Sequence, residues 1–178
     1  MRLRRKCLSN YLSLIVDADI ARSSGISEHP VSRNSRESLE FIIENDLKIA
    51  MCRELLNEWN KHRSIFARTW LSSMYAKKKV VPIKPLSKAI EKINNSEITS
   101  KEHSIASKDA HLIDAALHAD KVILSNDDNA REVFCKISEK HKDLQSIRWF
   151  NVVNHSSEAC DCLLKKQNLT PQKFFLGI

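Results

Sequence analysis

The chain is nearly devoid of glycine: only Gly25 and Gly177 occur among its 178 residues. Glycine-rich phosphate loops and dinucleotide-binding turns need at least two glycines at short, fixed spacing, so both motifs are excluded. Long hydrophobic runs are absent too, and none approaches the roughly 18 residues of a membrane-spanning helix. The N-terminus is basic and then apolar, but it runs into Asp17 and Asp19 without a small-residue cleavage site. We therefore interpret it as the approach to a first strand rather than as a signal peptide.

Cysteine patterns that would indicate disulfides or a metal site are also missing. The five cysteines are odd in number and none forms a CxxC pair, so free thiols in a reduced, cytoplasmic protein are the simplest interpretation. Cys160 and Cys162 could chelate a metal only if they pointed the same way, and on a helix they do not. Hydrophobic residues make up 42% of the chain, enough to form a core, and its formal charge is +7. These features predict a single domain, 1–178, with an anionic partner.

Short apolar runs alternate with amphipathic segments along the chain. This alternation predicts an α/β fold with a mainly parallel sheet rather than a helical bundle. Residues 23–37, rich in serine, predict a mobile loop, and residues 95–107 predict a polar connection. The strands are predicted at 11–16, 47–51, 122–125 and 146–153, and the helices at 38–43, 53–63, 85–95, after Ser107, after Asp128 and at 156–166.

Carboxylates mark the junctions between these elements. Asp17 follows the first strand, Asp127 and Asp128 follow the strand at 122–125, and Asp109 stands in the first turn of the helix after Ser107. In a parallel sheet the carboxyl ends of strands and the amino ends of helices lie along the same edge. We therefore expect these acids to meet there.

Each acid taken alone has an ordinary explanation. An acid in a first helical turn favours the helix dipole, which accounts for Asp109, and Asn129 with Glu132 fits a capping box for the following helix. Gathered at one edge, however, unpaired carboxylates repel one another by several kcal/mol per close pair. A divalent cation with oxygen ligands, Mg²⁺ or Mn²⁺, would neutralise them.

Helical angles separate acids that face the core from acids that face away. In the helix predicted at 53–63, Glu58 lies about 110° from the centre of the apolar face and Glu54 about 150° away, at about 100° per residue. Glu58 therefore borders the core and Glu54 points outward. In the next acidic helix, Asp109 lies on the apolar face that packs on the sheet. The opposite face carries His111, Asp114 and His118. We expect this face to be exposed, and these three residues are a candidate set of metal ligands.

Three segments resemble one protein family. LIVDADI (14–20) is similar to the first strand of the PIN-domain nucleases, CRELLNEW (52–59) to the helix with their second acid, and KDAHLIDAALHADKVILSNDD (108–128) to their third helix–strand unit. The resemblance covers about residues 12–152 and leaves 153–178 as a C-terminal helix and tail. The chain departs from the family in having Ser125-Asn126 where Thr-Gly is usual, and in a long segment between residues 60 and 107.

The resemblance implies a three-layer α/β/α sandwich and metal-dependent cleavage of phosphodiester bonds, most often in RNA, with single-stranded DNA as the alternative. Small members of this family are often toxins of toxin–antitoxin pairs and often dimers. The resemblance therefore also implies an antitoxin or another protein regulator, or a second copy of the chain, as a partner. One or two Mg²⁺ or Mn²⁺ ions would be held by four catalytic acids, Asp17, Glu58, Asp109 and Asp127. The auxiliary or alternative positions are Asp19, Glu54, Asp114 and Asp128.

Basic residues in two segments are candidate nucleic-acid contacts. Basic side chains interleaved with the aromatic residues Trp70 and Tyr75 are typical of proteins that bind single-stranded nucleic acid. The alternative interpretations are a solvated loop for the first segment and a partly buried helix with a lysine-rich end for the second. The candidates are Arg22, Arg33 and Arg36, followed by Arg68, Lys77, Lys78 and Lys79.

Two other functions fit some of the same residues. Asp17 and Asp19 after an apolar strand fit the nucleophile and acid of haloacid-dehalogenase-like phosphohydrolases, with Asp127 and Asp128 holding Mg²⁺. That family also needs a strand that ends in Ser or Thr, for which we find no convincing candidate, and a lysine such as Lys101 or Lys108; Ala21 also stands where Thr or Val is typical. The third hypothesis is an RNA-binding module that keeps the PIN-like fold without catalysis.

Overall fold

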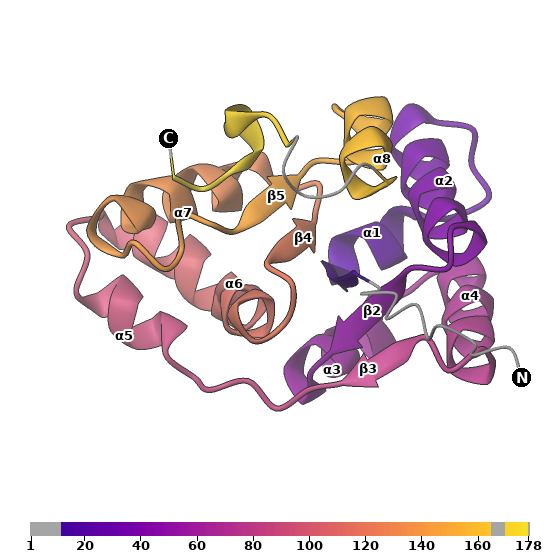
Figure 1. Cartoon of the computed structure of the whole chain (residues 1–178), viewed down its shortest axis with the longest axis horizontal. Coiled ribbons are helices and arrows are strands. Elements are labelled where there is room, and N and C mark those ends of the chain that lie inside the picture. Colours follow the sequence, from indigo (N-terminus) through magenta and orange to yellow (C-terminus); the bar gives the residue numbers. More distant parts are fainter. Residues whose placement is uncertain (1–11, 165–169, 178) are drawn as a thin grey trace, which may run out of the picture.

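Five parallel strands run through the middle of the protein, in the order β3-β2-β1-β4-β5 (Figure 1). The structure, a computed structural model, describes residues 12–164 and 170–177. Tyr11, Cys7 and the last two residues of the helix predicted at 156–166 lie outside this range. The strands are β1 (Ser13–Val16), β2 (Lys48–Met51), β3 (Val80–Pro82), β4 (Val122–Leu124) and β5 (Arg148–Phe150).

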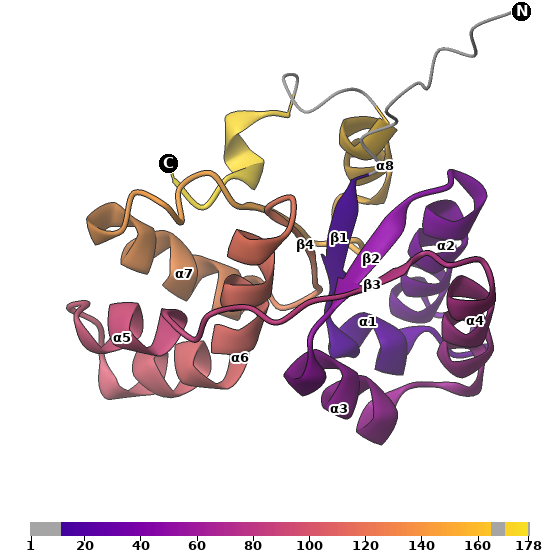
Figure 2. The same ribbon diagram turned by 60° about the horizontal axis from the view of Figure 1, so that its bottom comes forward.

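Helices cover both faces of this sheet, so the predicted three-layer α/β/α fold is confirmed. On one face α6 packs against α5 and α7, and on the other α2 packs against α4 and α8 (Figures 1 and 2). No helix in the described part of the chain is long and apolar enough to cross a membrane. The helices are α1 (Ala18–Ser23), α2 (Pro30–Glu44), α3 (Arg53–His62), α4 (Ile65–Ala76), α5 (Ala89–Asn94), α6 (Ser100–His118), α7 (Asp128–Lys140) and α8 (Ser156–Leu164), with a 3₁₀ turn at Gln172–Phe174.

The central strands are continuous apolar runs because both of their faces are covered. Leu14, Ile15 and Val16 of β1 are fully or almost fully buried, as is all of β4. Val80–Pro82 forms the edge strand β3, which is absent from the strands predicted from the sequence. An edge strand tolerates proline, which has no N–H to donate to a neighbour.

The loop predicted at residues 23–37 is correct for residues 24–29 but wrong from Pro30 onward, where α2 begins. Proline is favoured in the first turn of a helix, and the His29 ring caps this one by accepting a hydrogen bond from the Val31 amide at 3.3 Å. The serines that predicted a loop include Ser35, which is fully buried and whose carbonyl accepts a hydrogen bond from the Ser38 hydroxyl at 2.8 Å. Small polar residues thus lie on the inner side of this helix.

The polar connection predicted at residues 95–107 is wrong in its second half, which is helical. A capping box starts α6 at Ser100: the Thr99 amide donates to Glu102 at 2.8 Å, and the Glu102 amide donates back to the Thr99 hydroxyl. Asp109 therefore lies in the middle of α6 rather than in its first turn. The helix dipole does not explain an acid at that position.

The order of the strands creates one preferred position for a site. The chain builds β1, β2 and β3 in one direction and then crosses to the other side of β1 to form β4 and β5. In open parallel sheets such a reversal leaves a crevice at the carboxyl ends of the two strands where the order changes. Here those strands are β1 and β4, which end at Val16 and Leu124.

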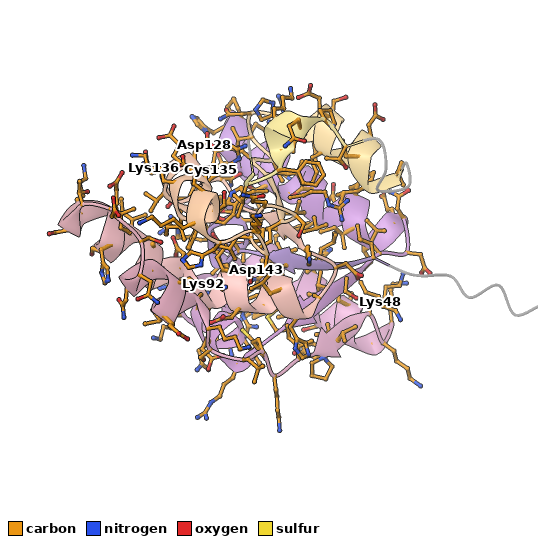
Figure 3. The ribbon with its side chains drawn as sticks, turned by 60° about the vertical axis from the view of Figure 1, so that its left-hand side comes forward. Lys48, Lys92, Asp128, Cys135, Lys136 and Asp143 are labelled. Atoms are coloured by element: carbon orange, nitrogen blue, oxygen red, sulfur yellow. The ribbon has the colours of Figure 1, made fainter. Side chains whose placement is uncertain are left out.

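Polar contacts tie the layer that follows the crossover. Lys92 of α5 forms an ion pair with Asp143, just beyond α7, at 2.9 Å (Figure 3). Lys136 of α7 pairs with Glu102 of α6. These ion pairs connect α5, α6 and α7, the helical layer to which the acidic residues of α6 belong.

Candidate functional site

A pocket of about 660 Å³ opens at the carboxyl ends of β1 and β4. Segments far apart in the sequence form its walls: the end of β1 with α1, the outer part of α3, the middle of α6, and the turn from β4 into α7. The structure brings together six of the predicted acids in this pocket, Asp17, Asp19, Glu58, Asp109, Asp127 and Asp128.

Asp17 is held at the end of β1 from two directions. Its amide donates to the Leu124 carbonyl at 2.9 Å, which joins β1 to the end of β4, and its Oδ2 accepts a hydrogen bond from the Ser125 hydroxyl at 2.7 Å. Only 8% of Asp17 is exposed. Burial is the main cause of a raised pKa for this carboxyl, which the Ser125 hydrogen bond opposes.

Asp19 lies two residues further on, in the first turn of α1, and faces the same loop. Its Oδ2 accepts hydrogen bonds from the Asn126 amide at 2.8 Å and from the Ser125 hydroxyl at 3.4 Å. Its Oδ1 is buried and has no hydrogen-bond partner. Burial and the neighbouring Asp17 raise the pKa of Asp19 to about 8, so the carboxyl is costly to ionise without a compensating cation.

Asp109 enters the pocket from the opposite wall. It is 6% exposed, and burial first and then repulsion by Asp17 raise its pKa to about 7. Asp127 and Glu58 also raise this pKa, and the adjacent Lys108 lowers it. Carboxylates from four segments that are distant in the sequence therefore lie close enough for their charges to interact with that of Asp109.

Asp127 and Asp128 occupy the start of α7. Asp127 is the N-cap: its Oδ1 accepts a hydrogen bond from the Ala130 amide at 2.9 Å. The capping box predicted from Asn129 and Glu132 is therefore wrong, since the N-cap is Asp127, two residues before Asn129. Asp128 is exposed and accepts a hydrogen bond from Asn154 at 2.9 Å.

Glu58 reaches the pocket because its neighbour anchors α3. The buried indole of Trp59 donates a hydrogen bond to the Val16 carbonyl at 2.9 Å, immediately before Asp17. The Glu58 side chain is about one third exposed, in agreement with its predicted position at the border of the core. Glu54 is exposed and does not line the pocket.

The expectation that Asp114 faces solvent is wrong. Asp114 is 7% exposed, and its Oδ1 accepts hydrogen bonds from the amides of Lys88 and Ala89, both at 2.9 Å. These amides begin α5, which has no cap from its own N-cap side chain. The helical periodicity predicted that this face of α6 is exposed, but the segment before α5 covers it. Asp114 caps the amino end of α5.

Asp114→Ala is expected to lower the free energy of unfolding by about 1–3 kcal/mol, because two amides lose their acceptor. Asp114→Asn keeps an oxygen at this position and should lose markedly less. Urea unfolding of the two variants measures the difference. Equal losses, or weakened Mn²⁺ binding by a folded Asp114→Asn, would contradict a structural role.

The predicted nucleic-acid contacts fall into separate regions. Arg22 lines the pocket, whereas Arg33 and Arg36 form ion pairs with Glu37 and Glu28 on and beside α2. Arg68 is exposed on α4, outside the pocket lining. The lysines lie before β3, at the amino end of the strands and so at the opposite edge of the sheet; Lys77 and Lys78 are exposed there, and Lys79 is buried in an ion pair with Asp46.

Several pocket residues were not predicted. Lys108 precedes Asp109, and Asn151 directly follows β5, so the rule that collected the acids at strand ends would have found Asn151 too. The Asn151 amide donates to the Asn126 carbonyl at 3.2 Å and ties the ends of β5 and β4 together. The other unpredicted lining residues include His62, Asn126, Asn129 and Asn154.

The pocket has the donors for a hard divalent cation, though not a closed ligand set. Among residues 12–164 and 170–177, no three His, Cys, Asp or Glu side chains are already arranged so that they could hold a metal ion. The fit comes from the chemistry of the donors: carboxylate oxygens from four segments, the raised pKa values of Asp17, Asp19 and Asp109, and the unpartnered Oδ1 of Asp19. A cation would relieve both the repulsion and the unsatisfied oxygen.

No protein-family model matches the chain, and a search of curated proteins finds no significant match.

Proposed function

We propose that the protein is a metal-dependent nuclease of the PIN type, with RNA as the expected substrate. The observation that carries the proposal is the convergence of Asp17, Glu58, Asp109 and Asp127 on one pocket at the point where the strand order reverses. Buried carboxylates that repel one another are expensive to maintain, and such perturbed groups concentrate at functional sites.

These four acids would hold the ion, with Asp19 and Asp128 beside them. When bound, Mg²⁺ or Mn²⁺ would supply an activated water and stabilise charge on the leaving oxygen. Ser125 orients the Asp17 carboxylate through its 2.7 Å hydrogen bond. The phosphohydrolase alternative is less well supported, because it needs Asp19 to exchange a proton with substrate while its Oδ1 is buried and its Oδ2 is engaged by Asn126.

The strand would be bound by basic residues at the rim of the acidic pocket. Arg22 of α1 and Lys108 of α6 line it from different walls, and neither forms an ion pair with a carboxylate among the described residues, although the charge of Lys108 acts on the adjacent Asp109. An unpaired cation is free to contact a phosphate oxygen. Asparagine amides on the rim add neutral hydrogen-bonding groups that suit a ribose or a base edge.

The test is incubation of the protein with labelled RNA and single-stranded DNA in the presence of Mn²⁺, Mg²⁺ or EDTA. We expect cleavage of RNA with either metal and none with EDTA. A small phosphomonoester serves as a second substrate. Its turnover in place of RNA cleavage would favour the phosphohydrolase, and metal-independent cleavage would overturn the proposal.

Arg22→Glu is expected to weaken RNA binding and to reduce the slope of log K against log salt by about 1, the value for one lost phosphate contact. Lys77→Glu makes the same change of charge at the opposite edge of the sheet and is the matched control. Binding is measured by fluorescence anisotropy over a range of salt concentrations with Ca²⁺, to hold off cleavage. Equal effects of the two substitutions would show that only overall charge matters.

A further inference from the structure

A histidine of α6 reaches across to the acid of α3. His111 Nε2 lies 3.3 Å from Glu58 Oε2, and the histidine side chain is only 12% exposed. The sequence predicted this face of α6 to be exposed, but α3 covers it at His111. The Nε2 atom is buried and has no hydrogen-bond partner, and the Glu58 carboxylate lies within ion-pair distance of it.

Glu58 has fewer contacts to fix its side chain than Asp17 and Asp127 have. Asp17 and Asp127 are held in place by hydrogen bonds from Ser125 and Ala130. Glu58 is on the outer turn of α3 and forms no other ion pair or hydrogen bond with the described residues. A long, one-third exposed carboxylate without a partner would sample many rotamers, and most of them would point away from the pocket.

His111 is also placed where it can join the two halves of the site. It lies two residues after Asp109 on α6, and it is near enough to both Asp17 and Asp114 to interact with their charges. The imidazole is outside the pocket lining, near the carboxylates of Asp17, Glu58 and Asp114. In metal sites, partners in this outer position orient the ligands, and their loss costs about 10–100-fold in affinity.

We propose that His111 is a positioning residue that holds the Glu58 carboxylate toward the pocket and so completes the metal site. The inference rests on the proposed function, because it takes Glu58 as a metal ligand. It assigns a role to a residue that contacts neither the substrate nor the reacting atoms.

The test measures Mn²⁺ affinity by electron paramagnetic resonance of free Mn²⁺, without nucleic acid. His111→Ala is expected to weaken binding about 10–100-fold, and His111→Gln, which keeps a donor of similar reach, should recover part of the loss. His118→Ala removes an exposed histidine from the same helix and should bind like the wild type. Thermal unfolding without metal establishes that each variant is folded.

A double-mutant cycle separates positioning from general damage to the fold. In a Glu58→Gln background, His111→Ala or His111→Gln should cause little further loss of Mn²⁺ affinity, because the group that His111 holds is gone. Additive losses, or wild-type affinity in His111→Ala, would overturn the inference. Mn²⁺ binding by a wild type that cleaves no nucleic acid would overturn the nuclease proposal alone, whereas a wild type that binds no Mn²⁺ overturns both.

Discussion

Asp109→Asn is expected to abolish metal-dependent cleavage while making the metal-free protein more stable. The substitution removes a proposed metal ligand, and the loss of metal affinity should be at least the ~100-fold upper value for outer partners of metal ligands. It also removes a charge that is buried and repelled by Asp17. Stabilisation near pH 8 should therefore be on the order of 1–3 kcal/mol. A variant that loses activity and gains stability is the result expected when a substituted residue serves function rather than the fold.

The measurements are single-turnover RNA cleavage with Mn²⁺ and urea unfolding with EDTA. Glu40→Gln is the matched control, because Glu40 is an exposed acid of α2 outside the pocket lining. It should change neither quantity. Full activity in Asp109→Asn would remove Asp109 from the site, and a destabilised variant would show that its carboxylate supports the fold rather than a ligand.

The metal-free protein is expected to lose stability as the pH rises from about 4 toward 8. Burial raises the pKa of Asp109 to about 7 and that of Asp19 to about 8, from 3.8 in both cases, and raises the pKa of Asp17 as well. Above pH 4 the unfolded chain releases protons that the folded state keeps. Stability therefore falls by up to about 1.4 kcal/mol per pH unit for each such carboxyl, until the folded state ionises too.

Urea unfolding with EDTA at about pH 5, 6.5 and 8 measures this slope. The surface acid Glu102 has a pKa lowered to about 2 by Lys136 and Thr99. Its contribution to the free energy of unfolding is therefore lost only at a pH below the range of about 5 to 8 that is measured. Asp19→Asn should flatten the slope, and Mn²⁺ should restore stability most strongly at the highest pH, where the acids are ionised. A stability that is constant or rises over this range would contradict the burial of protonated acids.

Much of the site follows from local sequence. Asp17 and Asp127 come directly after buried apolar runs, and the parallel pairing of β1 with β4 places both at one edge, as the alternation of strands and helices predicted. Asp109 reaches the same edge although the start of its helix was misplaced by several residues. Its position on the apolar face of α6 depends on helical period alone, and the period does not change when the helix is longer.

What periodicity could not determine is what covers each remaining face. It placed Asp114 and His111 away from the sheet, but the segment before α5 and the helix α3 cover them, so one became a cap and the other a contact of Glu58. It also could not assign Lys77 to the edge opposite the pocket, because that required recognising β3 as a strand. Local sequence therefore determined which residues face the sheet and end its strands. Only the packing of distant segments decided which acids are buried, partnered and close enough to one another to form a site.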